Sequence, residues 1–206
     1  MKQLIYIFTF LIIGNIAKST TVKNDFHLIF KTSIQQDSLK QLEKIKTELD
    51  TLFKHNIDNL IILAKISNQD NLVLVKNGEF PENTETTFNI LKNKAGQIVS
   101  ISEIPTSESG DWYIVYSYYF DNNGKTFAFE RQTNFFNSLC TNGVAYETKT
   151  DFYDKNFNLL KSFYKLTNDK NENLRKEDCI FYYDFKYKII PNLKEYLELK
   201  KINNGR

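Results

Sequence analysis

The chain has 206 residues and carries 27 Lys and Arg side chains against 25 Asp and Glu. Lys2 and Lys18 lie in the first 19 residues, so removal of that segment leaves 25 basic and 25 acidic side chains. Proteins that bind nucleic acid or an anionic membrane normally carry a basic excess, so this composition argues against both kinds of partner.

Residues 1–19 have the pattern of a secretory signal peptide. Lys2 precedes an apolar run over residues 4–13, and a short stretch with an A-x-S cleavage pattern follows. An N-terminal core strand is the alternative interpretation. A membrane-spanning helix needs roughly 18 or more apolar residues, and this run is shorter. We therefore expect an exported protein, periplasmic or secreted, whose mature chain is a single domain over 20–206 with no transmembrane span after cleavage.

An amphipathic helix is predicted over residues 38–66, after a short edge strand at 26–30. Its apolar positions recur in steps of three and four, and they are Leu39, Leu42, Ile45, Leu49, Leu52, Phe53, Ile57, Leu60 and Ile61. This seam could pair with another chain as a coiled coil. Because the seam holds few clean heptads and Asn56 interrupts it, we expect the helix to pack on the chain's own sheet.

Residues 70–190 are predicted to form an antiparallel meander of about seven to nine strands. Turn clusters rich in Asn and Gly supply the positive φ angles of tight hairpins, and they cover 76–78, 93–96, 107–111, 121–124, 141–143, 154–158 and 168–173. A short helix is predicted over 191–201, opened by Pro191. The predicted fold class is α+β: the N-terminal helix packs on a twisted sheet, which is open or closes into a partial barrel.

The most aromatic segment is DWYIVYSYYF, residues 111–120. Neither of its alternating faces is polar, which is typical of a central strand covered on both sides. Residues 179–187 are predicted as a further strand with Phe and Tyr on one face. Most of these rings are assigned to the core. The alternative hypothesis is that some of them line a cleft for a sugar or a lipid, and the candidates are Trp112, Tyr116, Tyr118 and Tyr183.

The two cysteines, Cys140 and Cys179, are predicted to form a disulfide. An even cysteine count in a chain that reaches an oxidising compartment favours pairing. A pair of free buried thiols is the alternative.

No catalytic, metal or cofactor motif is present in the sequence. The only histidines are His27 and His55, no G-x-S-x-G turn occurs, and His and Cys lack zinc-ligand spacing. We therefore expect a protein without a cofactor, and more readily a binding protein than an enzyme. A carboxylate pair near the loop before the aromatic strand, drawn from Glu103, Glu108 and Asp111, is the remaining catalytic hypothesis.

Two segments, 154–158 and 169–173, share the pattern D-x-N-x-N that opens a calcium loop. Leu stands where such a loop requires Gly, and the bidentate Glu is missing from both. The same residues are preferred at hairpin tips, so we interpret them as turns.

The turns YYFDNNGKTFAF and DFYDKNFNLLKSF lie in a part of the chain, residues 86–190, that resembles uncharacterised secreted bacterial proteins. Those proteins share a signal peptide, a helical segment and an Asn/Lys/Tyr-rich β-meander. The resemblance implies no activity and transfers no site residues.

Three functions remain open from the sequence. The first is an exported, non-enzymatic binding or envelope-associated protein that holds a sugar, a lipid or an envelope protein. The second is a hydrolase that acts on an envelope or extracellular polymer through a carboxylate pair. The third is an assembly protein that uses the 38–66 helix to pair with another chain.

Overall fold

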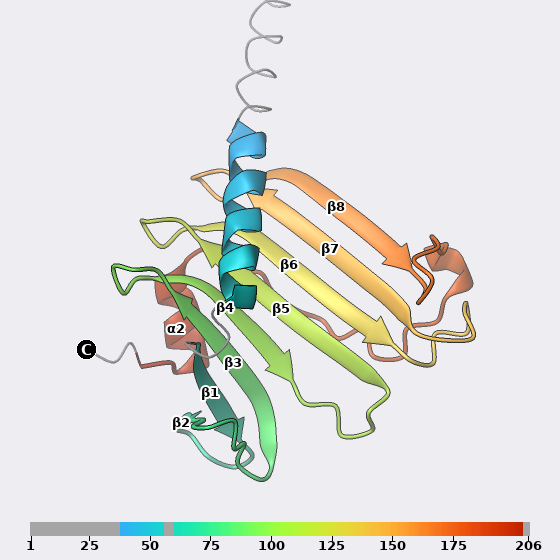
Figure 1. Ribbon diagram of the computed structural model, residues 1–206, viewed down its shortest axis with the longest axis horizontal. Coiled ribbons are helices and arrows are strands. Elements are labelled where there is room, and N and C mark those ends of the chain that lie inside the picture. The colour runs from blue at the N-terminus through green and yellow to red at the C-terminus, as the bar shows by residue number, and fades with distance from the viewer. Residues whose placement is uncertain (1–37, 56–59, 204–206) are drawn as a thin grey trace, which may run out of the picture. The chain divides into compact units, whose positions relative to one another are not determined.

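The computed structural model describes residues 38–55 and 60–203. The predicted signal peptide (1–19) and the predicted edge strand (26–30) lie outside the described residues. Within them the chain forms a helix at 38–55, an open antiparallel sheet of eight strands and a short C-terminal helix (Figure 1). This arrangement confirms the predicted α+β class. The sheet is not closed, so the partial-barrel alternative does not apply.

The sheet is a meander with one exception at its first edge. Its order is β2-β1-β3-β4-β5-β6-β7-β8, and neighbouring strands pair antiparallel throughout. The strands are β1 (Ile61–Ile66), β2 (Val73–Leu74), β3 (Thr84–Lys92), β4 (Ile98–Pro105), β5 (Trp112–Phe120), β6 (Thr126–Phe135), β7 (Ala145–Tyr153) and β8 (Leu159–Thr167). β5, the predicted central strand, lies well inside the sheet.

Several hairpin tips are built by one local device, an Asp or Asn side chain that caps its own turn. Asp154 shows it clearly, because its Oδ1 accepts hydrogen bonds of 2.8 Å from the backbone N–H groups of Asn156 and Asn158. The side chain and backbone of Asn158, with the N–H of Asn156, also hold the pKa of the Asp154 carboxyl below its usual range. The first of the two D-x-N-x-N segments, 154–158, is therefore an Asx-turn. The same device recurs at Asn93, Asp121 and Asn168.

The predicted helix over 38–66 was too long. It is described as helix over 38–55, and residues 61–66 form strand β1 instead. β1 pairs with β3 along its length, from Ile61 opposite Ile90 to Ile66 opposite Thr84. Isoleucine is a preferred strand residue, and the ladder to β3 outweighs the helical spacing of the apolar positions.

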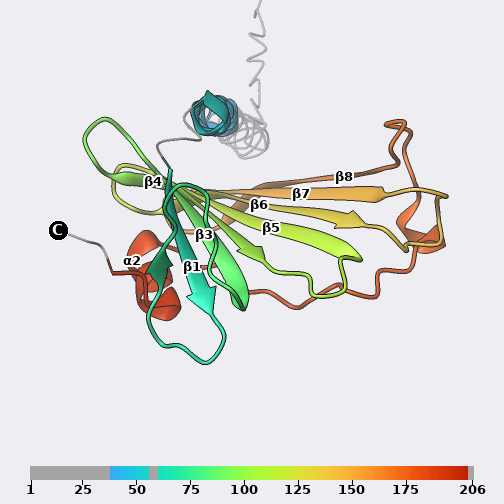
Figure 2. The same ribbon diagram turned by 60° about the horizontal axis from the view of Figure 1, so that its bottom comes forward.

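The apolar seam of the 38–55 helix packs on one face of the sheet, as predicted (Figure 2). The side chains that meet there are Leu39, Leu42, Ile45 and Leu49 from the helix and Tyr119, Phe127, Ala128 and Phe152 from the sheet. Part of the seam considered as an alternative for a coiled coil is therefore occupied by the chain's own sheet. We call this side of the sheet the helix face.

The opposite face is covered by the C-terminal part of the chain. Residues 179–190, predicted to include a strand, form none; they follow the short helix η2 (Lys176–Asp178) as an irregular segment. The predicted alternation of inward-facing rings still holds. The ring of Phe181 stacks on Phe135 of β6 with the ring centres 4.3 Å apart, and the ring of Tyr187 stacks on Phe129 of β6 with the centres 5.4 Å apart. Every second side chain of this segment packs on the sheet, although its backbone forms no strand hydrogen bonds with the sheet. The alternation of aromatic residues therefore comes from side-chain packing.

Helix α2 (Leu193–Lys200) closes the same face at one end (Figure 2). Its N-cap is Asn192, whose side chain accepts a hydrogen bond from the N–H of Glu195 at 3.0 Å, so the helix begins after Pro191 rather than at it. Tyr196 of α2 is fully buried against the rings of Tyr118 and Phe120. β5 is therefore covered on both sides at its Phe120 end, and it is a central strand of the sheet, as predicted.

Cys140 and Cys179 form the predicted disulfide, with their Cα atoms 4.7 Å apart. It ties the start of the C-terminal segment to the loop after β6, and a hydrogen bond of 2.8 Å from the N–H of Ile180 to the carbonyl of Ser138 reinforces the junction. Disulfides are typical of proteins outside the reducing cytoplasm. In the described part of the chain no helix has the length and hydrophobicity to cross a membrane.

Replacing both cysteines by Ala is expected to lower the free energy of unfolding by about 2–4 kcal/mol, because the bond closes a loop of 39 residues in the unfolded chain. Urea unfolding of the variant and of the reduced wild type measures the change. Equal stability of oxidised and reduced wild-type protein would contradict this account of the bond.

Candidate functional site

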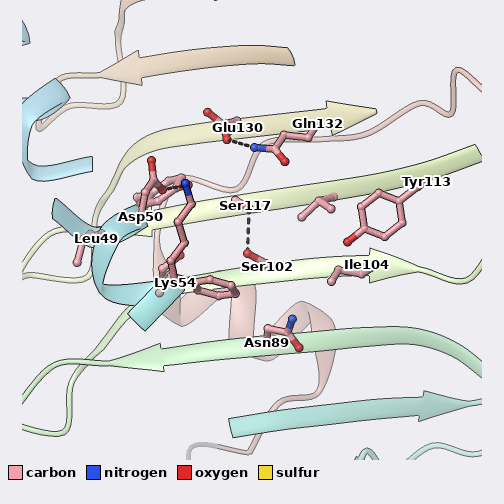
Figure 3. Close-up of a pocket in the computed structure, with 14 residues that line it drawn as sticks. Leu49, Asp50, Lys54, Asn89, Ser102, Ile104, Tyr113, Ser117, Glu130 and Gln132 are labelled. Carbon is pink, nitrogen blue, oxygen red and sulfur yellow. Dashed lines mark hydrogen bonds between the residues drawn. The ribbon is translucent and has the colours of Figure 1, made fainter. Parts of the chain in front are cut away.

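A cavity of about 330 Å³ opens on the helix face between the 38–55 helix and strands β3 to β6 (Figure 3). Its lining is Leu49, Asp50, Phe53, Lys54, Asn89, Ser100, Ser102, Ile104, Tyr113, Val115, Ser117, Tyr119, Glu130 and Gln132. The helix forms one end, and Tyr113 lies at the other end, away from the helix (Figure 3). We call this cavity the helix-face groove.

The floor of the groove is a row of polar side chains in register across the sheet. Asn89 lies opposite Ser102, Ser102 opposite Ser117, Ser117 opposite Glu130, and Glu130 opposite Thr150. The hydroxyls of Ser102 and Ser117 share a hydrogen bond of 2.9 Å, although both residues are buried. A central sheet face that is polar across five strands is unusual for a core, and it gives the groove hydrogen-bonding capacity.

Glu130 is the most heavily bonded residue of this row. Its carboxylate accepts hydrogen bonds from Gln132 at 2.7 Å and Thr150 at 2.8 Å, and it pairs with the Lys46 ammonium at 2.8 Å. Lys46 also donates to Asp50 at 2.9 Å. Both Lys46 and Glu130 are buried, so the pair ties the helix to the sheet by a charge contact largely shielded from water.

Tyr119 completes the network beneath the helix. Its hydroxyl donates to the second oxygen of Asp50 at 2.7 Å, and the Lys46 ammonium lies 4.7 Å from the centre of its ring. Burial raises the pKa of the Tyr119 hydroxyl well above its usual range, and the carboxylates of Glu130 and Asp50 raise it further. Tyr119 therefore stays neutral and acts as a hydrogen-bond donor at the helix end of the groove.

The open end of the groove presents uncharged groups to solvent. Tyr113 is 43% exposed, and Gln132 is exposed although its amide nitrogen is engaged by Glu130. Lys54 lies exposed at the helix end. The groove can thus offer an aromatic ring, an amide and hydroxyls to a ligand that enters from this side.

The four aromatic residues singled out from the sequence lie on the other face. Trp112, Tyr116 and Tyr118 are buried and Tyr183 is half-buried; Trp112 contacts the Tyr183 ring at 6.0 Å. The Tyr118 hydroxyl donates to the carbonyl of Lys188 at 3.0 Å, and burial raises its pKa. The structure thus brings the four to one face, where Tyr183 belongs to the C-terminal segment that covers the three β5 rings, and none of them lines the helix-face groove. A binding role for them stays a prediction.

The three carboxylates considered for catalysis are not brought together. Glu103 is bound by Lys200 at 2.6 Å and by the Tyr196 hydroxyl at 3.0 Å, next to α2. It lies opposite Tyr116, five residues along the chain from Asp111, which corresponds to roughly 17 Å of strand. Asp111 instead accepts a hydrogen bond from the Tyr183 hydroxyl at 3.3 Å. Glu108 is exposed in the loop between them.

A different carboxylate pair, Asp50 and Glu130, does line one cavity. The ammonium of Lys46 lies between them, within 2.9 Å of one and 2.8 Å of the other. A pair that hydrolyses a glycosidic bond needs room for the bond and a water between its two carboxyl groups. The lysine occupies that position here, so this geometry offers the hydrolase hypothesis little support.

Residues 38–55 and 60–203 contain no cluster of side chains suited to binding a metal ion. No three His, Cys, Asp or Glu side chains in that part of the chain are arranged to hold an ion. His55, at the end of the helix, bonds to the carbonyl of Thr51 at 2.7 Å and is exposed.

The sequence did not identify the helix-face groove. The β5 face of Tyr113, Val115, Ser117 and Tyr119 was interpreted as apolar, yet Ser117 is the point where the polar row crosses it. A signal was present in the alternation of Ser100 with Ser102 and of Glu130 with Gln132 along two predicted strands. These polar positions become one site only when the cross-strand register is known.

The described chain thus defines an α+β protein whose open antiparallel sheet has one aromatic, covered face and one partly covered, polar face. Comparisons with protein-family models, with curated proteins and with solved structures give no match.

Proposed function

We propose that this chain is an exported, non-enzymatic binding protein that holds a small polar ligand in the helix-face groove. The observation that carries the proposal is the groove's polar floor, formed by side chains in register from β3 to β6. Ligand sites are typically concave, enclose about 300–1,000 Å³ and combine apolar walls with a few placed polar groups. The groove, at about 330 Å³, matches that description at its small end.

Two further features support binding rather than catalysis. At the helix end, Lys46 is bonded to both Glu130 and Asp50. The wall on the helix side is held by apolar packing of Leu42, Ile45 and Leu49 on the sheet. A groove whose walls are fixed in this way loses little conformational entropy when a ligand binds.

Export is supported by the N-terminal signal pattern and by the disulfide. We expect the mature chain to begin at or near Thr20 and to be periplasmic or secreted. The denatured mass of protein recovered from outside the cytoplasm measures the start of the chain and the two hydrogens lost on disulfide formation.

Tyr113→Ala is expected to release the ligand without unfolding the protein. Tyr113 lines the open end of the groove and is 43% exposed, so its removal costs little core packing but removes a contact surface. Native mass spectrometry of exported wild-type protein should show added mass that disappears on denaturation, and the variant should lack it. Tyr182→Ala, on the C-terminal segment and 64% exposed, is the matched control that should keep the added mass.

Two results would contradict the proposal. One is a wild-type protein that carries no added mass in native mass spectrometry and whose backbone-amide NMR spectrum does not change when concentrated culture medium is added. The other is bound mass that Tyr113→Ala retains in full.

A further inference from the structure

Beyond the groove, the helix face continues as an exposed surface over β5 to β8. The 38–55 helix packs near Tyr119 and Phe152, towards one end of these strands, and among the described residues no helix covers their opposite ends on this face (Figure 1). Tyr113 of β5 lies opposite Asn134 of β6, and Asn134 lies opposite Tyr146 of β7. We call this row, together with the adjacent pair Gln132 and Thr148, the tyrosine platform.

The platform is continuous with the groove. Tyr113 and Gln132 belong to both, so a ligand in the groove meets the platform at its open end. Tyr146 is 38% exposed and Tyr113 43% exposed. Neither ring is among the residues that pack in the three hydrophobic clusters of the described chain.

The charge of the tyrosine platform indicates whether a charged or an uncharged ligand fits it. The platform residues are uncharged, and the neighbouring Lys165 donates to Asn171 at 2.8 Å. At the groove end, Glu130 is satisfied by Lys46, Gln132 and Thr150. The platform itself therefore offers rings, amides and hydroxyls and carries no charge, and the ammonium groups of Lys165 and Lys161 lie beside it on the same face of β8. An uncharged polar ligand complements such a platform.

The arrangement of rings and amides points to sugars. Tyrosine supplies a rigid apolar face with a polar tip, and that face can stack on the C–H side of a pyranose while Asn and Gln bond its hydroxyls. Tyr113 and Tyr146 are two strands apart, roughly 10 Å, so one sugar ring cannot cover both. Two sugar units of one oligosaccharide can each stack on one of the two rings.

Other ligands fit less well. An extended peptide binds a sheet by pairing with an edge strand, whereas the backbone groups here are already paired between β5, β6 and β7. A lipid tail needs a continuous apolar surface, and Asn134 and Thr148 interrupt it.

We propose that the ligand is a neutral oligosaccharide chain that enters the helix-face groove with one unit and lies across the tyrosine platform with the following units. This inference rests on the proposed function of the groove. It assigns Tyr113 and Tyr146 to stacking and Asn134 to hydroxyl recognition between them.

Isothermal titration calorimetry of the mature, oxidised protein with cellohexaose, maltohexaose and hexa-N-acetylchitohexaose tests it. We expect at least one of these to bind, and Tyr146→Ala to weaken that binding about tenfold, the loss typical of one stacked aromatic anchor. Tyr146 lines no part of the groove, so its effect reports the platform alone. Tyr182→Ala is again the control and should bind as the wild type does. Circular dichroism melts of each variant show whether it is folded.

The outcomes separate the two proposals. Binding of none of the hexasaccharides, together with a native bound mass that Tyr113→Ala loses, would overturn the oligosaccharide inference and leave the groove as a site for another small ligand. Binding that Tyr146→Ala does not weaken would overturn it as well. Absence of both hexasaccharide binding and native bound mass would remove the two proposals together, and a bound mass in the range of a protein would point to a macromolecular partner instead.

Discussion

Trp112→Ala is expected to lower the free energy of unfolding by about 3–5 kcal/mol, the usual cost of truncating a large buried ring. Trp112 is only 9% exposed, and its ring contacts Tyr183 at 6.0 Å and Phe185 at 5.2 Å. Removing it takes away the surface on which the C-terminal segment packs. Equilibrium unfolding in urea, followed by far-ultraviolet circular dichroism, measures the loss.

Trp112→Phe is the matched control, since it keeps an aromatic ring and should cost less than the Ala variant. The same experiment decides between core and cleft for Trp112, one of the aromatic residues considered as a ligand site from the sequence. A Trp112→Ala protein of unchanged stability that has lost its ligand would show that this ring is a binding surface and would contradict our assignment of the site to the helix face.

Lys46→Met is expected to cost about 3–5 kcal/mol, because it leaves the buried carboxylate of Glu130 without its counter-charge. The methionine keeps most of the apolar stem of the lysine, so the loss reports the charge rather than the packing. Glu130 retains hydrogen bonds from Gln132 and Thr150, which places the effect towards the lower end of that range. Urea midpoints of the variant and the wild type measure it.

The double variant Lys46→Met with Glu130→Gln should recover much of the loss, since both charges are then absent. Destabilisation by the double variant equal to that of Lys46→Met would contradict the idea that an unpaired carboxylate causes the effect. Because this pair also holds the helix over the groove, we expect Lys46→Met to weaken ligand retention at concentrations of urea that leave the wild type folded.

Local sequence chemistry predicted much of the fold. The hairpin tips follow from residues that act on their own turns, such as Asp154, and this is why their positions were correct from sequence alone. β5 was identified as a central strand because its apolar residues occur on both faces. The disulfide was predicted from the even number of cysteines and from the expectation that the chain reaches an oxidising compartment.

The errors arose where distant parts of the chain decide the structure. Residues 61–66 have helical spacing of apolar side chains, but pairing with β3 makes them a strand. Residues 179–187 alternate as a strand does, yet they pack their rings on the sheet without joining it. Both patterns record which side chains are buried and not which backbone groups pair.

The candidate site was the least predictable part. Ser102, Ser117 and Glu130 are separated in sequence by 12 residues or more, and each is an ordinary polar residue in its own strand. Register brings them into one row, and the helix makes that row the floor of a groove. The aromatic residues drew attention to the opposite face because large rings are conspicuous in a sequence, whereas a polar row across strands is not.

The most direct test of the account is hydroxyl-radical footprinting of the exported protein, with its ligand and after the ligand has been removed by dialysis. The method reports the accessibility of individual side chains, so it distinguishes the two faces of β5. We predict that removal of the ligand increases oxidation of Tyr113 and Tyr146 and leaves Tyr182 unchanged. Increased oxidation of Trp112 and Tyr183, with Tyr113 unaffected, would place the ligand on the aromatic face and contradict the assignment of the helix-face groove as the binding site.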